Sequence, residues 1–290
     1  MIPGALESNL VETSGAGRVG TTLTGGIAHT KGTPPTQLIA STAAEAQGVY
    51  VMARGVSTAA TDTGVLLDIM IGAALSETVL IPDIDCGEAH TNSLGVIHYF
   101  PVQIAAGTRI SARLQGTQAM ETADVAVWLA ESCQHVEDVA GWVAYGEDAA
   151  ASRGVSVTPA TDTWGTWTEI GTTTADHNVF RVGVDLLGDT TVTARDDLIQ
   201  IGYGASAPGA GGTAIVGNFA LKVLGGEDMI GVGPTSAVYA VVASGTKVWA
   251  RIASGGTEAR GVIIYGALGT VVAGSAGIIG GRGHRAGVAR

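Results

Sequence analysis

Apolar and polar residues alternate over many short stretches of this chain, which is the pattern of β-strands with one buried face. The clearest case is residues 110–114, where Ile110, Ala112 and Leu114 share one face. Arg113 lies between two of them and faces the other way. Similar β-rich runs occupy residues 49–53, 65–71, 79–81, 96–100, 125–129 and 248–252. No window shows sustained helical periodicity with capping residues, so the pattern predicts an all-β protein with strands about ten residues apart.

The chain also repeats itself. Three pairs of blocks match in the same order: residues 36–74 with 166–204, residues 104–114 with 242–252, and residues 125–129 with 262–266. The first pair aligns without a gap and places Thr42 opposite Thr172. The second places Gly107 opposite Gly245 in Gly-Thr turns, where glycine would supply a positive φ. Three matches in one order indicate an internal duplication, with the extra residues of the second copy expected near residues 206–212.

We therefore expect two tandem jelly-roll-like β-sandwich domains, each with about seven or eight strands, flanked by segments outside the repeat. The expected parts are an extended N-terminal arm at residues 1–33, a first β-sandwich domain at 34–133, a linker at 134–163, a second β-sandwich domain at 164–268 and a Gly-rich C-terminal tail at 269–290. The arm and the tail are too rich in glycine to form a domain. We expect neighbouring subunits to hold them in place.

Composition narrows the classes of function. The chain has 290 residues and a formal net charge of −11, and only 15 residues are Lys or Arg. Binding to phosphates needs basic residues gathered on one face, and these are scattered, so we expect no nucleic-acid partner. Residues 266–281 form the most apolar late stretch, but they are too short and too rich in Gly and Ser to span a bilayer. The N-terminus lacks the pattern of a signal peptide, so we expect a soluble protein made in the cytoplasm, with no membrane partner.

No residue pattern points to an active site, a metal or a cofactor. The six histidines form no H-E-x-x-H or H-x-H pattern. The carboxylates of residues 83–88 resemble a weak calcium loop, but they are too few and the second copy lacks them. Residues 204–212 are glycine-rich without the order of a phosphate-binding loop. Cys86 and Cys133 occur only in the first copy, so we expect free thiols rather than a disulfide framework. We predict no catalytic residues, no cofactor and no metal.

Arginine and tryptophan supply the remaining candidates for contact with a partner. Arg113 and Arg251 occupy equivalent positions on the outer faces of two strands. Each could bind a carboxylate of a neighbouring subunit or pair with an acidic group of its own domain. Arg282 and Arg285 belong to a small basic cluster in the C-terminal tail. Five tryptophans could form a platform for a sugar: Trp128, Trp142, Trp164, Trp167 and Trp249. Trp128 aligns with Tyr265, so that position is aromatic in both copies, which favours packing in the core or between domains.

Residues 104–114, followed by residues 125–129, resemble a pattern of tailed-bacteriophage virion proteins, in which an aliphatic strand leads through a Gly-Thr turn into a strand with alternating Arg. Residues 242–252 and 262–266 repeat it. The resemblance implies a structural protein of a phage particle, as a capsid decoration (cement) protein, a head fibre or a tail component. It implies other virion proteins as partners, such as the major capsid or tail proteins, a homo-oligomer such as a trimer, and a location in the virion. It carries over no catalytic residues.

Three functions follow from these observations. The leading hypothesis is non-enzymatic: the chain stabilises neighbouring virion subunits, with glycine-rich arms that add strands to sheet edges. The alternative is a receptor- or carbohydrate-binding tail protein, which would need exposed aromatic residues clustered at one end of a sandwich. The third is an enzyme acting on glycans, which would require a pair of carboxylates facing one cleft. The sequence offers no such pair.

Overall fold

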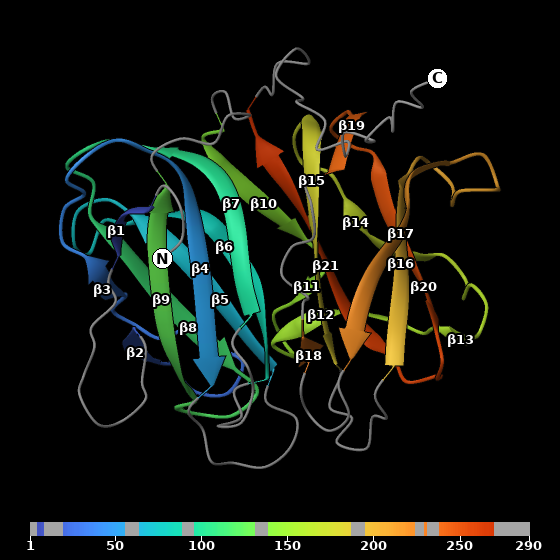
Figure 1. Ribbon diagram of the computed structural model, residues 1–290, viewed down its shortest axis with the longest axis horizontal. Coiled ribbons are helices and arrows are strands. Elements are labelled where there is room, and N and C mark those ends of the chain that lie inside the picture. The colour runs from blue at the N-terminus through green and yellow to red at the C-terminus, as the bar shows by residue number, and fades with distance from the viewer. Residues whose placement is uncertain are drawn as a thin grey trace, which may run out of the picture.

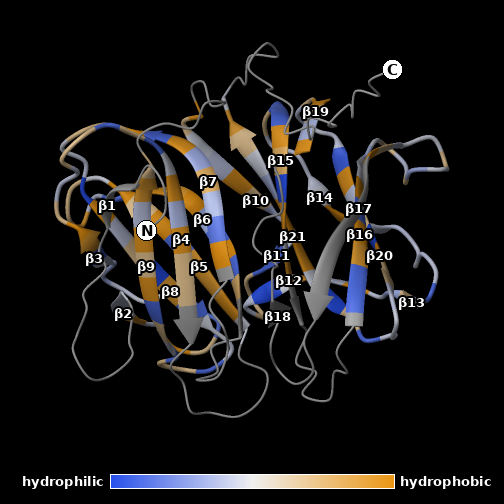
Figure 2. Ribbon diagram, viewed as in Figure 1, coloured by the Kyte–Doolittle hydropathy of each residue, from blue (hydrophilic) through white to orange (hydrophobic). Residues whose placement is uncertain are grey.

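The computed structural model describes residues 5–8, 20–55, 64–88, 96–130, 139–186, 195–223, 229–230 and 238–269. These residues form strands and turns, with no helix among them (Figure 1). Apolar and polar residues alternate along many of the strands (Figure 2). The prediction of an all-β protein is confirmed. Nowhere in the described segments is there a helix long and apolar enough to cross a membrane.

Two facing antiparallel sheets build the first sandwich in the described part of the chain. Its strands are β1 (Ala5–Ser8), β2 (Thr21–Thr24), β3 (Thr36–Ile39), β4 (Ala46–Gly55), β5 (Gly64–Ile71), β6 (Thr78–Glu88), β7 (Val96–Ile104), β8 (Ile110–Gly116) and β9 (Thr122–Ala130). One sheet has the order β2-β9-β4-β7, with β1 on the same edge of β9 as β2, and the other has the order β3-β8-β5-β6. Counted from β2, the first strand pairs with the last, the second with the last but one, and so on inward. This is the strand order of a jelly roll.

The second sandwich repeats this order. Its strands are β10 (Gly141–Tyr145), β11 (Glu147–Asp148), β12 (Arg153–Val157), β13 (Ala160–Thr161), β14 (Thr168–Thr172), β15 (His177–Leu186), β16 (Arg195–Tyr203), β17 (Thr213–Val223), β18 (Met229–Ile230), β19 (Val238–Val242), β20 (Lys247–Ser254) and β21 (Arg260–Leu268). The sheets run β12-β21-β15-β19 and β14-β20-β16-β17, with β10 beside β12 on β21. Short strands β11, β13 and β18 extend the edges. The chain is therefore a tandem of two jelly-roll sandwiches, as the duplication predicts.

Parts of the expected arm and linker belong to the sandwiches themselves. Strand β2 lies within residues 1–33 and completes the first sandwich, and β10, β12 and β13 lie within residues 134–163 and pair in the second. The edges also match, because β1 and β2 share one edge of β9 as β10 and β12 share one edge of β21. The duplication thus reaches further toward the N-terminus than the sequence blocks. These edge strands are short and differ in sequence between the copies, so no block match could reveal them.

The gapless pairing of residues 36–74 with 166–204 is wrong in register. Thr42 is equivalent to Thr173 rather than to Thr172. The hydroxyls of Thr42 and Thr173 make the same two contacts. Thr42 Oγ1 donates to Ala105 O at 2.8 Å and accepts from the N–H of Thr108 at 3.0 Å. Thr173 Oγ1 donates to the carbonyl of residue 243 at 2.7 Å and accepts from the N–H of residue 246 at 3.0 Å. The turns between strands differ in length, so one fixed offset cannot follow both copies.

The glycine turns are placed as the sequence predicts. Gly107 and Gly245 have φ values of 80° and 81°, and the N–H of each donates to the carbonyl of Thr42 or Thr173. Residues 204–212, which join β16 to β17, replace the shorter segment 72–77 of the first copy, so part of the expected insertion lies there.

An apolar interface joins the two sandwiches, which lie side by side in Figure 1. Trp142 of β10 and Tyr265 of β21 belong to the same buried cluster as the core of the first sandwich. The ring of Phe100 meets them edge-on, with centroids 5.3 and 5.6 Å away. The Tyr265 hydroxyl donates to Asp83 O and accepts from the N–H of Asp85, both at 2.9 Å. Burial of these side chains across the boundary makes the two sandwiches one packed body.

Candidate binding surface

Arg113 and Arg251 lie on the outer faces of equivalent sheets, on strands β8 and β20. Along β20 the predicted alternation is confirmed, since Val248, Ala250 and Ile252 are buried while Trp249 and Arg251 are half-buried on the opposite face. The equivalence holds across the sheet as well. Arg113 pairs in register with Asp68 of β5, and Arg251 pairs in register with Gln200 of β16.

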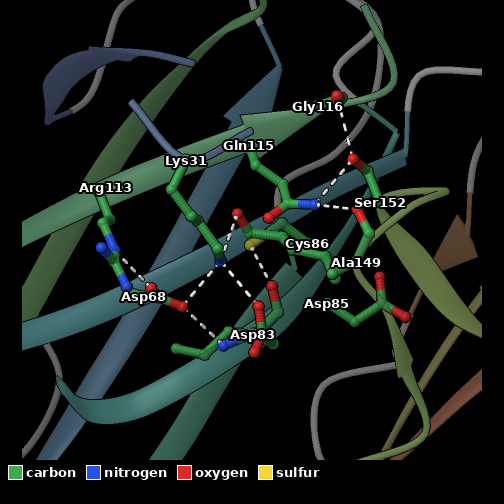
Figure 3. A network of polar contacts seen from close by, with 12 residues as sticks. Lys31, Asp68, Asp83, Asp85, Cys86, Arg113, Gln115, Gly116, Ala149 and Ser152 are labelled. Carbon is green, nitrogen blue, oxygen red and sulfur yellow. Dashed lines mark hydrogen bonds and ion pairs between the residues drawn. The ribbon is translucent and has the colours of Figure 1, made fainter. Parts of the chain in front are cut away.

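In the first sandwich, Arg113 is held by an acidic side chain of its own domain. Its Nε donates to Asp68 Oδ2 at 2.7 Å (Figure 3). Lys31 Nζ contacts Asp68 Oδ1 at 2.7 Å and Asp83 Oδ1 at 2.8 Å. We call Lys31, Asp68, Asp83 and Arg113 the Asp68 network. Burial alone would raise the pKa of the Asp68 carboxyl, but Lys31 and the hydrogen bonds from Asp83 N–H, Lys31 and Arg113 outweigh it and lower the pKa. Asp68 therefore stays ionised and offsets the charge of Arg113.

The neighbouring contacts in Figure 3 tie the second sandwich to the first. Gln115 Nε2 donates to Ala149 O at 2.8 Å and to Ser152 Oγ at 3.1 Å. Ser152 Oγ in turn donates to Gly116 O at 3.0 Å. These hydrogen bonds join polar groups of the two sandwiches beside the Asp68 network. Their role is to hold the domain boundary together rather than to bind a partner.

In the second sandwich, aromatic rings surround the equivalent arginine. Arg251 Nε donates to Gln200 Oε1 at 2.7 Å. The guanidinium carbon lies 4.6 Å from the ring centroid of Trp167 and 5.0 Å from that of Trp164, within the range of cation–π contacts. Gln200 is neutral, and none of the ion pairs among the described residues involves Arg251.

A third indole completes this surface. Trp249 precedes Arg251 on the same face of β20, and its Nε1 donates to Gly204 O at 3.1 Å. Lys247 Nζ lies 5.8 Å from the Trp249 ring centroid. Lys247 also pairs with Glu169 at 2.7 Å, where both side chains are about two-fifths exposed. We call Trp164, Trp167, Trp249, Arg251 and Lys247 the tryptophan face.

Backbone contacts fix the segment that carries Trp164 and Trp167. Trp164 forms an isolated bridge with Ala253 of β20, and the N–H of Gly165 donates to Ile252 O at 2.9 Å. A Cβ at Gly165 would lie 2.6 Å from Thr158 O, so only glycine fits there. In the sequence, these tryptophans and Arg251 are separate candidates for contact with a partner. Only the cross-strand register brings them together.

The other sequence candidates do not form a site in the described residues. Trp142 is buried at the domain interface, and no group of His, Cys, Asp and Glu suited to a metal ion occurs in the described ranges. Cys86 is buried and unpaired, and burial raises the pKa of its thiol, so it is poorly reactive at neutral pH. Three candidate residues lie outside the described residues: Cys133, Arg282 and Arg285.

A buried histidine at the domain boundary makes stability depend on pH. Burial, and secondarily the charge of Arg181, lowers the pKa of His98 from 6.5 to about 3. Below pH 6.5 the unfolded chain therefore binds a proton that the folded chain excludes, so stability falls as pH falls toward 3. We expect the free energy of unfolding to drop by about 1.4 kcal/mol per pH unit across this window. Urea denaturation at several pH values measures the slope.

The His98→Leu variant separates this effect from other titrations. It should lose most of the slope between pH 6 and pH 4. A remainder is expected from His177, whose pKa burial also lowers. Asp68 contributes to the pH dependence of stability only at lower pH, because the pKa of its carboxyl lies below the ordinary value. An unchanged slope in His98→Leu would contradict the burial of a neutral imidazole.

Fold and surface together define an all-β protein of two jelly-roll sandwiches, with an aromatic and basic face on the second. No protein-family model and no curated protein matches the sequence. Among solved structures, PNGF-II is similar at 8% identity and a TM-score of 0.36, over 90% of this chain and 64% of PNGF-II, so this chain spans less than two thirds of that protein. PNGase F, a glycosylasparaginase from Flavobacterium meningosepticum, is similar at 10% identity and a TM-score of 0.28, over 90% of this chain and 94% of that one.

A tandem of CBM22 domains from Xyn10C of Paenibacillus barcinonensis is similar at 12% identity and a TM-score of 0.23, over 91% of this chain and 98% of that one. These similarities are too weak to place the chain in a family. Its fold assignment rests on its own strand order.

Proposed function

We propose that this chain is a non-enzymatic structural protein of a bacteriophage particle that binds and stabilises neighbouring virion subunits, as a capsid decoration (cement) or head-fibre protein. The observation that carries the proposal is strand β1. This segment of the N-terminal arm covers the part of the β9 edge that β2 leaves unpaired, with Ala5 opposite Ala130 and Ser8 opposite Trp128.

Strand addition of this kind suits assembly between chains. Backbone hydrogen bonds supply the affinity, so the edge of β9 can accept any extended segment of suitable register. The same arm could therefore pair with a neighbouring copy, which is the principle of domain swapping. An exposed edge is otherwise a liability in a β protein, and a strand from an arm covers it.

The packed interface between the sandwiches supports the same role. The side chains of Tyr265 and Trp142, from the second sandwich, are buried in the core cluster of the first and donate hydrogen bonds to its backbone. The chain therefore presents two sandwiches in a fixed orientation. A rigid two-part body can contact two neighbouring subunits at once, and fixed geometry keeps the effective concentration of the second contact high.

The first test is the composition of purified particles. Gradient-purified virions from the source of this sequence, analysed by quantitative mass spectrometry, should contain the chain at a constant ratio to the major capsid or tail protein. Negative-stain images of particles with and without the chain should then differ at discrete positions. Absence of the chain from purified virions would refute the proposal.

The second test removes the arm. A chain that lacks residues 1–19 keeps β2 and both sandwiches, and we expect it to bind particles devoid of the native chain at least about ten-fold more weakly. The control replaces residues 1–19 by a Gly-Ser segment of equal length, which should bind equally weakly because it lacks β1. Circular dichroism verifies that both variants fold. Full binding by the shortened chain would show that the arm plays no part in assembly.

A further inference from the structure

We propose that the tryptophan face binds a saccharide that carries a carboxylate. This inference concerns a different surface from β1 and the edge of β9, and does not depend on the structural role in a virion.

The first argument is the gathering of indole rings on one outer face. Trp164, Trp167 and Trp249 are half-buried rather than core residues, and all three lie along β20 or beside it. The outer face of an antiparallel sheet is ordinarily polar. A cluster of partly exposed aromatic rings with polar side chains among them is typical of a ligand-binding surface.

The second argument is the charge of Arg251. At the equivalent position of the first sandwich, Arg113 donates through Nε to the carboxylate of Asp68. Gln200 stands where Asp68 would be, so Arg251 keeps a hydrogen bond but gains no ion pair from it. The first sandwich thus shows which group an arginine at this register binds. A carboxylate from outside would supply to Arg251 what Asp68 supplies to Arg113.

The third argument concerns the molecule that carries this carboxylate, which we infer to be a sugar acid. A pyranose ring presents an apolar C–H face to an indole and hydroxyls to neighbouring amide and charged side chains. Gln200, Glu169 and Lys247 provide such groups beside the rings, on neighbouring strands. Arginine binds planar carboxylates with charge-assisted hydrogen bonds, which are stronger than neutral ones. A neutral sugar would use the indoles but leave the charge of Arg251 without a counterpart.

Titration calorimetry and tryptophan fluorescence of the full chain test the proposal. The probes are tetragalacturonate and sialyllactose, which carry a uronic acid and a sialic acid, with methyl-esterified tetragalacturonate and lactose as their neutral counterparts. We expect at least one acidic probe to bind with a millimolar or lower Kd, about ten-fold or more tightly than its neutral counterpart. Affinity for the acidic probe should fall as salt concentration rises.

Variants locate the binding. Arg251→Gln and Trp167→Ala should each weaken binding of the acidic probe by about ten-fold or more. The matched control is Arg113→Gln, which changes the equivalent arginine of the first sandwich and should leave binding unchanged. Trp128→Phe, remote from the face, is a second control if Arg113→Gln fails to fold. The proposal is overturned if neither acidic probe binds at millimolar concentration, if neutral and acidic probes bind equally, or if Arg251→Gln retains full affinity.

Discussion

Replacing Arg260 by methionine is expected to lower the free energy of unfolding by about 3–5 kcal/mol. Arg260 and Asp197 have fully buried side chains, and Arg260 Nε donates to Asp197 Oδ2 at 2.8 Å. The pair links β21 in one sheet of the second sandwich to β16 in the other. Without the arginine, the buried carboxylate of Asp197 loses the positive charge that Arg260 supplies, and burial strongly penalises a charge. Equilibrium denaturation in urea measures the loss.

The double variant Arg260→Met with Asp197→Val should recover most of that loss. The equivalent positions of the first sandwich are Ala123 and Val65, both buried and apolar, so this fold accepts an apolar pair there. A buried ion pair replaced by apolar residues is often neutral in stability. The control is Lys247→Met, which breaks an exposed ion pair with Glu169 and should cost no more than about 1 kcal/mol. A loss in Arg260→Met as small as in this control would contradict the buried pair.

Replacing Trp142 by alanine should cost about 3–5 kcal/mol, the usual range for a buried Trp or Phe. Trp142 belongs to the second sandwich by its strand, β10, but its ring is buried with the core of the first. Its Nε1 donates to Pro101 O at 3.0 Å, and the variant leaves that carbonyl without this donor. Because the ring links the two sandwiches, its loss should also weaken their coupling.

Calorimetry distinguishes these two effects. We expect one cooperative transition for the unaltered chain and two separate transitions for Trp142→Ala, because the second sandwich also has a buried cluster of its own, apart from the one that it shares with the first. Trp128→Ala serves as the control, since Trp128 is half-buried on the outer face of β9 and away from the domain interface. It should cost less and leave a single transition. A single transition with little change in stability for Trp142→Ala would show that the interface contributes little.

The two arginines show that residues at equivalent positions of the repeat can have different surroundings. Arg113 and Arg251 align by sequence and lie at the same register of equivalent sheets, one in each sandwich. Their surroundings nevertheless differ, because Asp68 faces one and Gln200 the other. The residues that decide this stand on strands β5 and β16, far along the chain from β8 and β20. The sequence pattern of one strand does not show which residues lie opposite it on the neighbouring strand.

The sequence by itself determined the all-β class, the duplication, the alternation of buried and partly exposed residues in β20, and the glycine turns at Gly107 and Gly245. The duplication is a comparison of two stretches of sequence, and the other features are local, since strand periodicity and positive φ depend on residues near in the chain. The tertiary structure alone decided that β2, β10 and β12 complete the sheets, which register relates the copies, and that Trp142 and Tyr265 join the sandwiches. It alone assembled the tryptophan face. All of these depend on pairing between strands that are distant in sequence, where turn lengths and bulges set the register.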